Sequence, residues 1–189
     1  MVLVGIMGKK GCGKDTVGYY LQNKHNFVKT AFATPLKDAC KILFMLNDEQ
    51  VNGDLKETPD ESWYKITPRK IMQFVGTELL RDKLNELIPE LGNNFHTYRF
   101  KLWYLQHQTS NVVITDVRFQ NEVDMIHSLG GYVIKLNRIY PLNNTDNTDN
   151  HISEKELENI NNYDDFIDNS SSLDNLYKNV DISLNKITL

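Results

Sequence analysis

A glycine-rich segment near the N-terminus constrains this chain more than any other stretch. It reads Gly8-Lys9-Lys10-Gly11-Cys12-Gly13-Lys14-Asp15-Thr16, follows an apolar run at residues 2–7 and precedes a helical pattern. Glycines let a backbone curl so that successive N–H groups point at phosphate oxygens, and the following helix adds its positive dipole end. Lys14 adds a mobile positive charge for the β- and γ-phosphates. The segment therefore predicts a phosphate-binding loop between a strand and a helix, in preference to an ordinary glycine-rich turn.

One position of this loop departs from the usual pattern. Asp15 stands where Ser or Thr usually follows the lysine, and the hydroxyl comes one residue later at Thr16. Asp15 either shares in binding a metal ion or interacts with the N-terminus of the helix. Cys12 is interpreted as a small residue that fills a tight turn, and a reactive thiol is the alternative.

Length and composition narrow the class of protein. A chain of 189 residues is long enough for one domain with a real core. A net charge of -4 argues against a nucleic-acid partner, and two cysteines are too few for a disulfide framework. No apolar segment approaches the length of a membrane span, and the N-terminus does not resemble a signal peptide. We therefore expect a soluble cytoplasmic protein with no membrane partner.

Strand and helix patterns alternate along the chain. The predicted strands cover residues 2–7, 27–32, 112–116, 132–136 and 165–168. Helices are predicted at 14–25, from Pro35, from Thr67, at 95–108, at 119–129, from Ser153 and from Ser172. Residues 47–62 are predicted to form a loop or a short insertion, and residues 143–150 a mobile loop. This alternation predicts a three-layer α/β fold, in which a parallel sheet of about five strands is flanked by helices and ligands bind at the carboxyl ends of the strands.

Two of these helices have predicted apolar faces. In the helix from Pro35 the face is formed by Ala39, Ile42, Leu43 and Leu46. In the helix from Thr67, Ile71, Phe74 and Val75 cluster on one side, while Arg69, Gln73 and Gly76 fall on the other.

A carboxylate and a cation follow the strand at 112–116. Asp116 ends that strand and either holds Mg²⁺ beside the phosphate loop or caps the turn. Arg118 could stabilise a transferring phosphoryl group, clamp an acceptor phosphate, or pair with Asp116 or Glu122 for structure.

Two further cations stand at helix starts. Lys37 and Arg69 would suit a phosphate monoester if they share a cleft, and each alone suits a solvated surface equally well. Gln73 and Thr77 could then hydrogen-bond a base or sugar, and Gly76 would permit close approach. The five histidines show no metal-ligand spacing, so a zinc site is not expected. His151, Ser153 and Glu154 either close over phosphates or cap a helix.

Five segments together resemble the viral and bacteriophage deoxynucleoside monophosphate kinases, which belong to the P-loop nucleoside monophosphate kinases. They are Gly13-Lys14-Asp15-Thr16, Ala33-Thr34-Pro35-Leu36-Lys37, Arg69-Lys70-Ile71-Met72-Gln73-Phe74-Val75-Gly76-Thr77, Asp116-Val117-Arg118-Phe119-Gln120-Asn121-Glu122 and His151-Ile152-Ser153-Glu154. Their order and spacing over most of the chain are specific. The match departs from the family at Cys12, where serine is common, and at Arg138 and Pro141, which are usually adjacent.

The resemblance implies transfer of the ATP γ-phosphate to a deoxynucleoside 5′-monophosphate, with Mg²⁺ and with dGMP and dTMP as the leading acceptors. It implies catalytic roles for Lys14, Asp116 and Arg118, and metal ligation by Asp15, Thr16 and Asp116. Cofactor contacts fall on Gly8, Lys10, Gly11, Cys12, Gly13, Lys14, Asp15, Thr16 and Asn169. The segment Asn169-Ser170-Ser171-Ser172-Leu173 resembles the stretch that lies near the ATP base in such kinases. Acceptor contacts fall on Lys37, Arg69, Gln73, Gly76, Thr77, Asp116, Arg118, Gln120 and Asn121, and lid contacts on Arg138, His151, Ser153 and Glu154.

The same resemblance organises the chain as a single kinase domain over residues 1–189. An acceptor-binding helical part covers about 35–110, and a lid covers about 138–160. Two other functions remain open: a kinase for another small acceptor such as dephospho-coenzyme A, and a non-catalytic nucleotide-binding switch. A homodimer through the aromatic helix near Trp103 is also left open.

Overall fold

The computed structural model describes residues 1–138 and 152–187, and for residues 152–155 it describes the backbone alone. The chain forms two compact units, residues 1–31 with 101–189 and residues 32–100. We call them the sheet unit and the helical unit. The predicted acceptor-binding part overlaps the helical unit.

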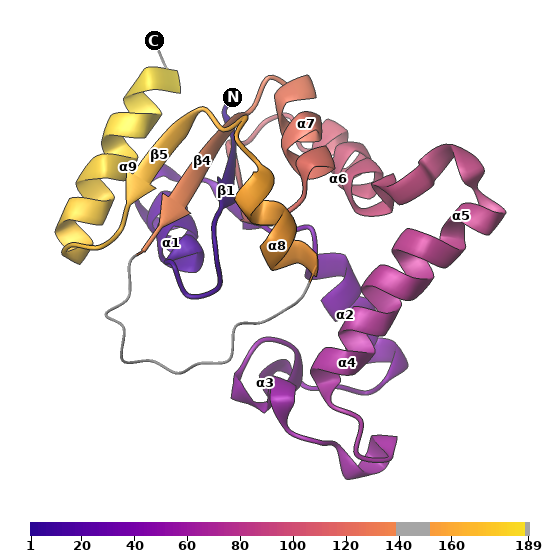
Figure 1. Ribbon diagram of the computed structural model, residues 1–189. Coiled ribbons are helices and arrows are strands. Elements are labelled where there is room, and N and C mark those ends of the chain that lie inside the picture. Colours follow the sequence, from indigo (N-terminus) through magenta and orange to yellow (C-terminus); the bar gives the residue numbers. More distant parts are fainter. Residues whose placement is uncertain (139–151, 188–189) are drawn as a thin grey trace. The chain divides into compact units, whose positions relative to one another are not determined.

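The sheet unit is built on five parallel strands (Figure 1). They are β1 (Leu3–Met7), β2 (Val28–Thr30), β3 (Val112–Val117), β4 (Tyr132–Asn137) and β5 (Asp165–Asp168), in the spatial order β2-β3-β1-β4-β5. β1 is therefore central, and every residue of β1 is buried, as a strand covered on both faces requires. The predicted α/β class and parallel five-stranded sheet are confirmed.

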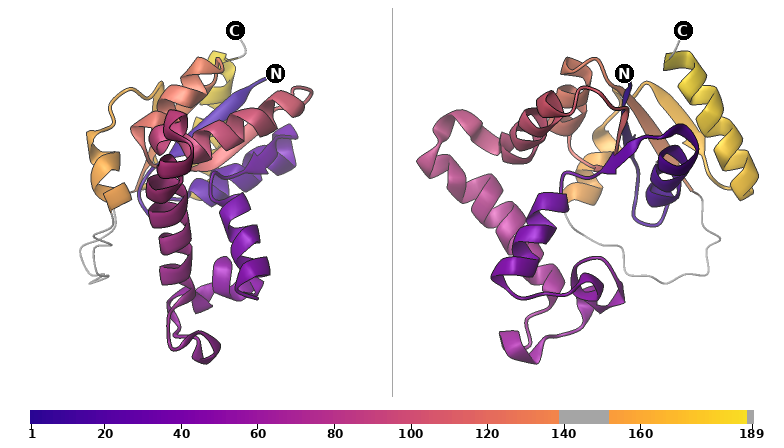
Figure 2. Two further views of the ribbon diagram at one scale, coloured as in Figure 1. Left: turned by 90° about the vertical axis from the view of Figure 1, so that its right-hand side faces the viewer. Right: turned by 180° about the vertical axis from the view of Figure 1, so that it is seen from behind.

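Helices cover both faces of this sheet (Figure 2). α1 (Lys14–His25) and α9 (Leu173–Ile187) share one buried cluster with β1, β4 and β5. On the other face α7 (Gln120–Ser128) reaches β1, because a methyl group on Gly5 would meet the Ile126 side chain. α6 (Phe95–Gln106) and α8 (Ile152–Asn159) complete the helices that contribute residues to this unit.

The helical unit holds shorter elements. They are α2 (Thr34–Leu43), α3 (Asp48–Val51), α4 (Pro68–Gln73), the π-helix η3 (Phe74–Lys83) and α5 (Leu84–Leu87), with short 3₁₀ turns at 54–57, 61–63 and 89–94. Its core contains Cys40, Leu46, Val51, Ile71 and Val75. The predicted loop at 47–62 is thus partly helical, because Asn47 and Gln50 form a capping box that starts α3.

Both apolar faces predicted in this unit are partly wrong. Ile42 and Leu43 are 79% and 66% exposed, because α2 instead turns Leu36 and Cys40, one helical turn apart, toward the core. Phe74 is 46% exposed, because Ile71 and Val75, four residues apart, turn toward the core, and Gly76 is buried against Leu36.

Differences elsewhere are confined to element ends. The predicted strand at 27–32 is reduced to β2 at 28–30, and the other predicted strands are found within a residue or two. The predicted mobile loop at 143–150 lies outside the described residues. Among the described helices none is long and apolar enough to cross a membrane.

A polar network ties α1 to α9. The Asp181 carboxylate accepts hydrogen bonds from Tyr20 Oη at 2.9 Å and Lys24 Nζ at 2.8 Å, and lies 2.8 Å from His25 Nε2. Tyr20 also stacks on Tyr177, with ring centroids 4.0 Å apart. Burial opposes ionisation of Asp181, but hydrogen bonds from Lys24, His25 and Tyr20 outweigh it and hold the pKa of Asp181 below its ordinary value.

Asp181→Asn is expected to lower the free energy of unfolding by about 1–2 kcal/mol at pH 7. A carboxyl whose pKa is lower in the folded state contributes stability above its unfolded pKa and loses it as pH falls through the folded value. The difference between wild type and variant should therefore shrink below about pH 4. Urea denaturation from pH 3 to 8 measures it, with the exposed Asp82→Asn as control. An equal difference at pH 3 and pH 7 would contradict the electrostatic account.

Candidate phosphate-binding site

The segment from Gly8 to Thr16 follows the carboxyl end of the central strand β1 and runs into the first turn of α1. Gly8, Gly11 and Gly13 have φ values of 152°, 80° and 104°, a backbone region that residues with a side chain rarely adopt. The N–H of Cys12 donates to the Lys9 carbonyl at 3.2 Å, which closes a tight turn within the loop. The loop therefore has the strand–turn–helix setting and the glycine conformations that a phosphate cradle requires.

Lys14 lies inside this loop. Its side chain is buried, and Nζ donates hydrogen bonds to the carbonyls of Gly8 at 2.6 Å and Lys9 at 2.7 Å. The first residue of α1 thus holds its ammonium group against the curve of the loop. Positive charge and the N-terminus of the helix are concentrated at one place, and this arrangement favours a bound anion.

Cys12 is part of the packing beneath the loop. Its side chain is buried within the cluster that includes α1, β4 and α9, and Sγ lies 3.9 Å from Lys14 Nζ. A methyl group on Gly8 would come within 2.6 Å of this sulfur. The burial agrees with a residue that fills a tight turn.

Asp15 has a partner that the sequence did not predict. Its carboxylate forms an ion pair with Lys29 of β2, with Nζ 2.8 Å from Oδ1, and Lys29 Nζ also lies 3.9 Å from the centroid of the Tyr19 ring. The Lys29 stem passes Gly18, where a methyl group would come within 2.9 Å of Cε. Asp15 therefore stands in the first turn of α1 while paired to a cation from the neighbouring strand.

Asp116 stands at an irregularity of β3. Gly5 pairs with Ile114 and Met7 with Val117, so two steps along β1 match three along β3. The extra residue makes a β-bulge beside the strand that leads into the loop, and bulges redirect side chains next to active sites. Asp116 is half-buried there. The sequence indicated the strand-terminal acid but gave no signal for the bulge.

The segment after Asp116 turns into α7. Glu122 is buried, and its Oε2 accepts the backbone N–H groups of Arg118 at 2.7 Å and Phe119 at 3.1 Å, which fixes the start of the helix. The Gln120 amide donates to Asp124 and Asn162, at 2.7 and 3.0 Å. Arg118 and Asn121 are half-buried. Gln120, predicted to contact the acceptor, thus already bonds to protein groups.

Asn169 contacts the phosphate loop through its side-chain amide. Its Nδ2 donates to the Cys12 carbonyl at 2.9 Å, and its side chain is buried. Asn169, expected near the nucleotide base, therefore contacts the phosphate loop directly. The sequence gave no signal for this contact.

The loop is also joined to α8. Lys9 Nζ lies 2.6 Å from Glu158 Oε1, and both side chains are more than half exposed. The hydrogen bond and the charge of Lys9 hold the pKa of Glu158 below its ordinary value. This contact between Glu158 and the loop could not be predicted from the sequence, because Lys9 and Glu158 are distant in the chain.

The helical unit holds the remaining predicted acceptor residues. Lys37 on α2 donates to Asn52 Oδ1 at 3.0 Å, and Arg69 in the first turn of α4 pairs with Glu57. The Thr67 hydroxyl caps α4 by accepting the N–H of Lys70. Gln73 ends α4 and is half-buried, as is Thr77 in η3.

Gly76 is a close-contact position within η3. A methyl group there would come within 2.7 Å of Leu36 Cδ2, and the Gly76 carbonyl lies 3.0 Å from His96 Nε2. Glycine at this position thus lets α2 and η3 pack together. π-Helical turns are frequent at functional sites.

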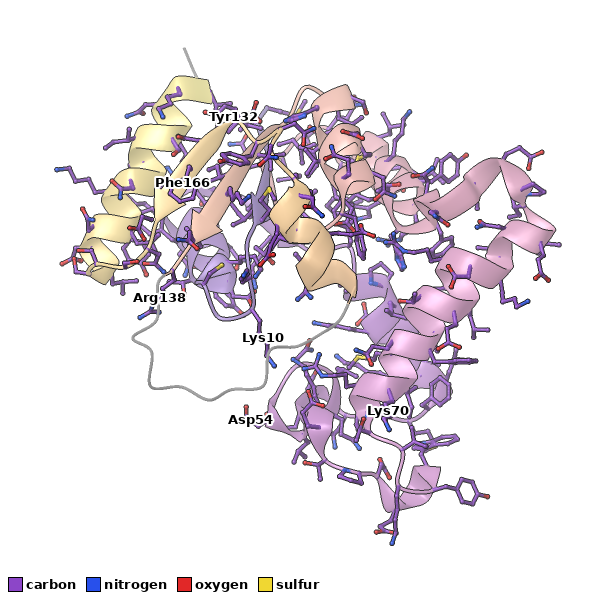
Figure 3. The ribbon with its side chains drawn as sticks, viewed as in Figure 1. Lys10, Asp54, Lys70, Tyr132, Arg138 and Phe166 are labelled. Carbon is purple, nitrogen blue, oxygen red and sulfur yellow. The ribbon has the colours of Figure 1, made fainter. Side chains whose placement is uncertain are left out.

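Predicted lid residues are only partly described. Arg138 follows β4, is exposed, and projects with Lys10 near the carboxyl-end edge of the sheet (Figure 3). His151 lies outside the described residues, and Ser153 and Glu154 belong to α8 without described side chains. Within the described part of the chain, no three His, Cys, Asp or Glu residues are grouped as a metal site would need.

Similarity to known proteins extends over nearly the whole chain. The family model for deoxynucleotide monophosphate kinase matches residues 55–180. A protein described as a putative deoxynucleotide monophosphate kinase from Acanthamoeba polyphaga mimivirus is 48% identical over 186 residues, which are 95% of this chain and 94% of that protein.

Two solved kinases are more distantly similar. Shikimate kinase from Aquifex aeolicus has a TM-score of 0.47 and 14% identity, with 99% of this chain and 98% of that chain covered. Dephospho-CoA kinase from Campylobacter jejuni has a TM-score of 0.47 and 15% identity, with 98% and 96% covered. The sequence matches, over most of the chain and at high identity, determine the family: the chain belongs to the deoxynucleotide monophosphate kinases.

Proposed function

We propose that this enzyme transfers the γ-phosphate of ATP to a deoxynucleoside 5′-monophosphate, with dGMP and dTMP as the leading acceptors and with Mg²⁺. The observation that carries the donor half is the Lys14 ammonium, held within the curve of a loop whose three glycines have positive φ. Family membership supports the acceptor class. The named bases come from the sequence resemblance alone.

Positioning and charge account for the proposed chemistry, because phosphoryl transfer requires no covalent nucleophile. The loop N–H groups and Lys14 hold the donor phosphates in this proposal. Arg118, at the start of α7, steadies the transferring or acceptor phosphate through its planar guanidinium. Glu122 supports this role, since it fixes the Arg118 backbone at 2.7 Å.

The oxygen donors near the loop fit Mg²⁺. Thr16 and Asp15 lie in the first turn of α1, and Asp116 lies on the bulge of β3 next to the strand that precedes the loop. Mg²⁺ prefers hard oxygen ligands and uses one or two carboxylates together with phosphate oxygens. When bound, the ion neutralises phosphate charge during transfer. Asp15 would divide its interactions between the ion and Lys29.

The acceptor residues are proposed within the helical unit. Lys37 and Arg69 supply the positive charge for a monophosphate, and Gln73 and Thr77 supply hydrogen bonds to the base or sugar. Arg69 is already oriented by Glu57, which favours a fixed phosphate clamp over a freely moving surface side chain. A homodimer through α6 stays a prediction.

An acceptor survey tests this function. ADP production is followed in a coupled assay with ATP, Mg²⁺ and each of dAMP, dCMP, dGMP and dTMP, the matching ribonucleotides, dephospho-coenzyme A, and no acceptor. We expect ADP production with dGMP and dTMP well above the rate without acceptor. Activity only with ribonucleotides or with dephospho-coenzyme A would disprove the substrate assignment. ATP binding without ADP production for any acceptor would favour a non-catalytic switch.

Breaking the Lys9–Glu158 ion pair is expected to change the KM for ATP by a small factor. Glu158→Gln removes the carboxylate that neutralises Lys9, so the loop becomes more positive and the KM for ATP should fall about twofold at low salt. The effect should disappear near 1 M NaCl, where the screening length is about 3 Å. Glu156→Gln, on the same helix and exposed, is the matched control. A KM that rises, or that changes equally in the control, would contradict this interpretation.

A further inference from the structure

Asn169 is held firmly where β5 leads into α9. Its backbone N–H donates to the carbonyl of Asn137, the last residue of β4, at 2.7 Å. On its other side, the Asp168 carboxylate accepts from the N–H of Ser170 at 3.1 Å and from its hydroxyl at 2.6 Å. Because the backbone is fixed on both sides, the direction of the Asn169 side chain is determined.

That side chain contacts the phosphate loop at one peptide group. Nδ2 donates to the Cys12 carbonyl at 2.9 Å, and a methyl group on Gly13 would lie 2.6 Å from the same nitrogen. Asn169 is only 7% exposed. The amide is therefore pressed against the Cys12–Gly13 peptide.

The geometry of that peptide links the contact to the loop's ligand. In a trans peptide the C=O and N–H groups point in opposite directions, and this peptide is trans. When Asn169 holds the Cys12 carbonyl, the Gly13 N–H must point away from Asn169. Without the hydrogen bond this orientation would be weakly determined, because glycine populates positive and negative φ about equally.

We propose that Asn169 is a positioning residue, which fixes the Cys12–Gly13 peptide so that the loop presents its N–H groups to the phosphates of the donor nucleotide. This inference rests on the proposed function. It assigns Asn169 to the phosphates through the loop, whereas the sequence resemblance placed it near the base. Donors fixed before binding contribute more than donors that must be ordered by the ligand.

Inorganic tripolyphosphate distinguishes the two roles, because it carries phosphates and no base. Calorimetric titrations of ATP and tripolyphosphate, at fixed Mg²⁺, are compared for wild type, Asn169→Ala and Asn169→Asp. We expect both variants to weaken both ligands by a similar factor, on the order of tenfold. Asn175→Ala, an exposed asparagine on α9, should bind as wild type does.

Kinetics supply the readout that a general loss of structure would not give. The KM for ATP should rise in both variants while the KM for the acceptor stays unchanged. Asn169→Asp keeps the volume of the side chain, so it carries the test if Asn169→Ala does not fold. Variants that weaken ATP but not tripolyphosphate would overturn the inference in favour of a base contact, and variants that bind both ligands as wild type does would also overturn it. A wild-type protein that binds neither ligand would instead disprove the proposed function.

Discussion

Replacing Lys14 with methionine is expected to lower kcat/KM by about two to three orders of magnitude, the loss typical of removing one preorganised charge from a transition state. The ammonium lies within the loop, 2.6 and 2.7 Å from the carbonyl oxygens of Gly8 and Lys9. Methionine preserves the length and burial of the side chain but provides no positive charge. The rate of ADP production with the best acceptor measures the effect.

The same substitution leaves two loop carbonyls without this donor, so a loss of stability on the order of 2 kcal/mol is expected as well. Circular dichroism and urea denaturation separate that loss from the loss of rate. Lys178→Met, on an exposed position of α9, is the matched control for exchanging a lysine. Turnover by Lys14→Met at the wild-type rate would show that Lys14 does not act on the phosphates.

Gly8→Ala is expected to lower the free energy of unfolding by about 3 kcal/mol or more. The residue has a φ of 152°, and its new methyl group would lie 2.3 Å from the Leu136 carbonyl oxygen and 2.6 Å from Cys12 Sγ. Leu136 belongs to β4, which pairs with β1 and β5, so the carbonyl cannot move without disturbing the sheet. Urea denaturation measures the loss, and ATP titration of the remaining folded protein should show weakened binding.

Gly130→Ala separates backbone strain from crowding. Gly130 has a φ of 71°, but a methyl group there would meet nothing within 4 Å. Only the cost of a positive φ remains, which is about 1 kcal/mol. Equal losses in the two variants would show that the contact with Leu136 is not what requires glycine at position 8.

Most of the fold could be predicted from local sequence patterns. The apolar runs at 112–116 and 132–136 read directly as strands, because a buried parallel strand needs no alternation and each run is bounded by polar or glycine-rich segments. Gly8, Gly11 and Gly13, the glycines of the predicted phosphate loop, have positive φ in the structure. Helix α4 followed from Thr67 and Pro68, since a cap and a proline in the first turn define where a helix starts.

Local sequence patterns did not predict the features that depend on packing against residues distant in the sequence. α2 carries apolar residues on two sides, and only packing against α4 and η3 decides that Cys40 rather than Ile42 is buried. The π-helical turns that begin at Phe74 have no signature in composition. Lys29 and Glu158, which pair with Asp15 and Lys9, are remote in sequence from the loop, so their contacts could not be predicted from spacing.

The central position of β1 has a consequence for the order of events during synthesis. β1 and the phosphate loop are synthesised before β3 and β4, the two strands that flank β1, and before Asn169, which follows β5 and contacts the loop. The N-terminal segment, apolar throughout its strand, must therefore wait for most of the chain before it acquires either neighbour. Long-range parallel pairing of this kind is slow and leaves apolar surface exposed in the meantime. The segment that most clearly marks this chain in sequence thus gains its native strand neighbours only after β3 and β4 have been made.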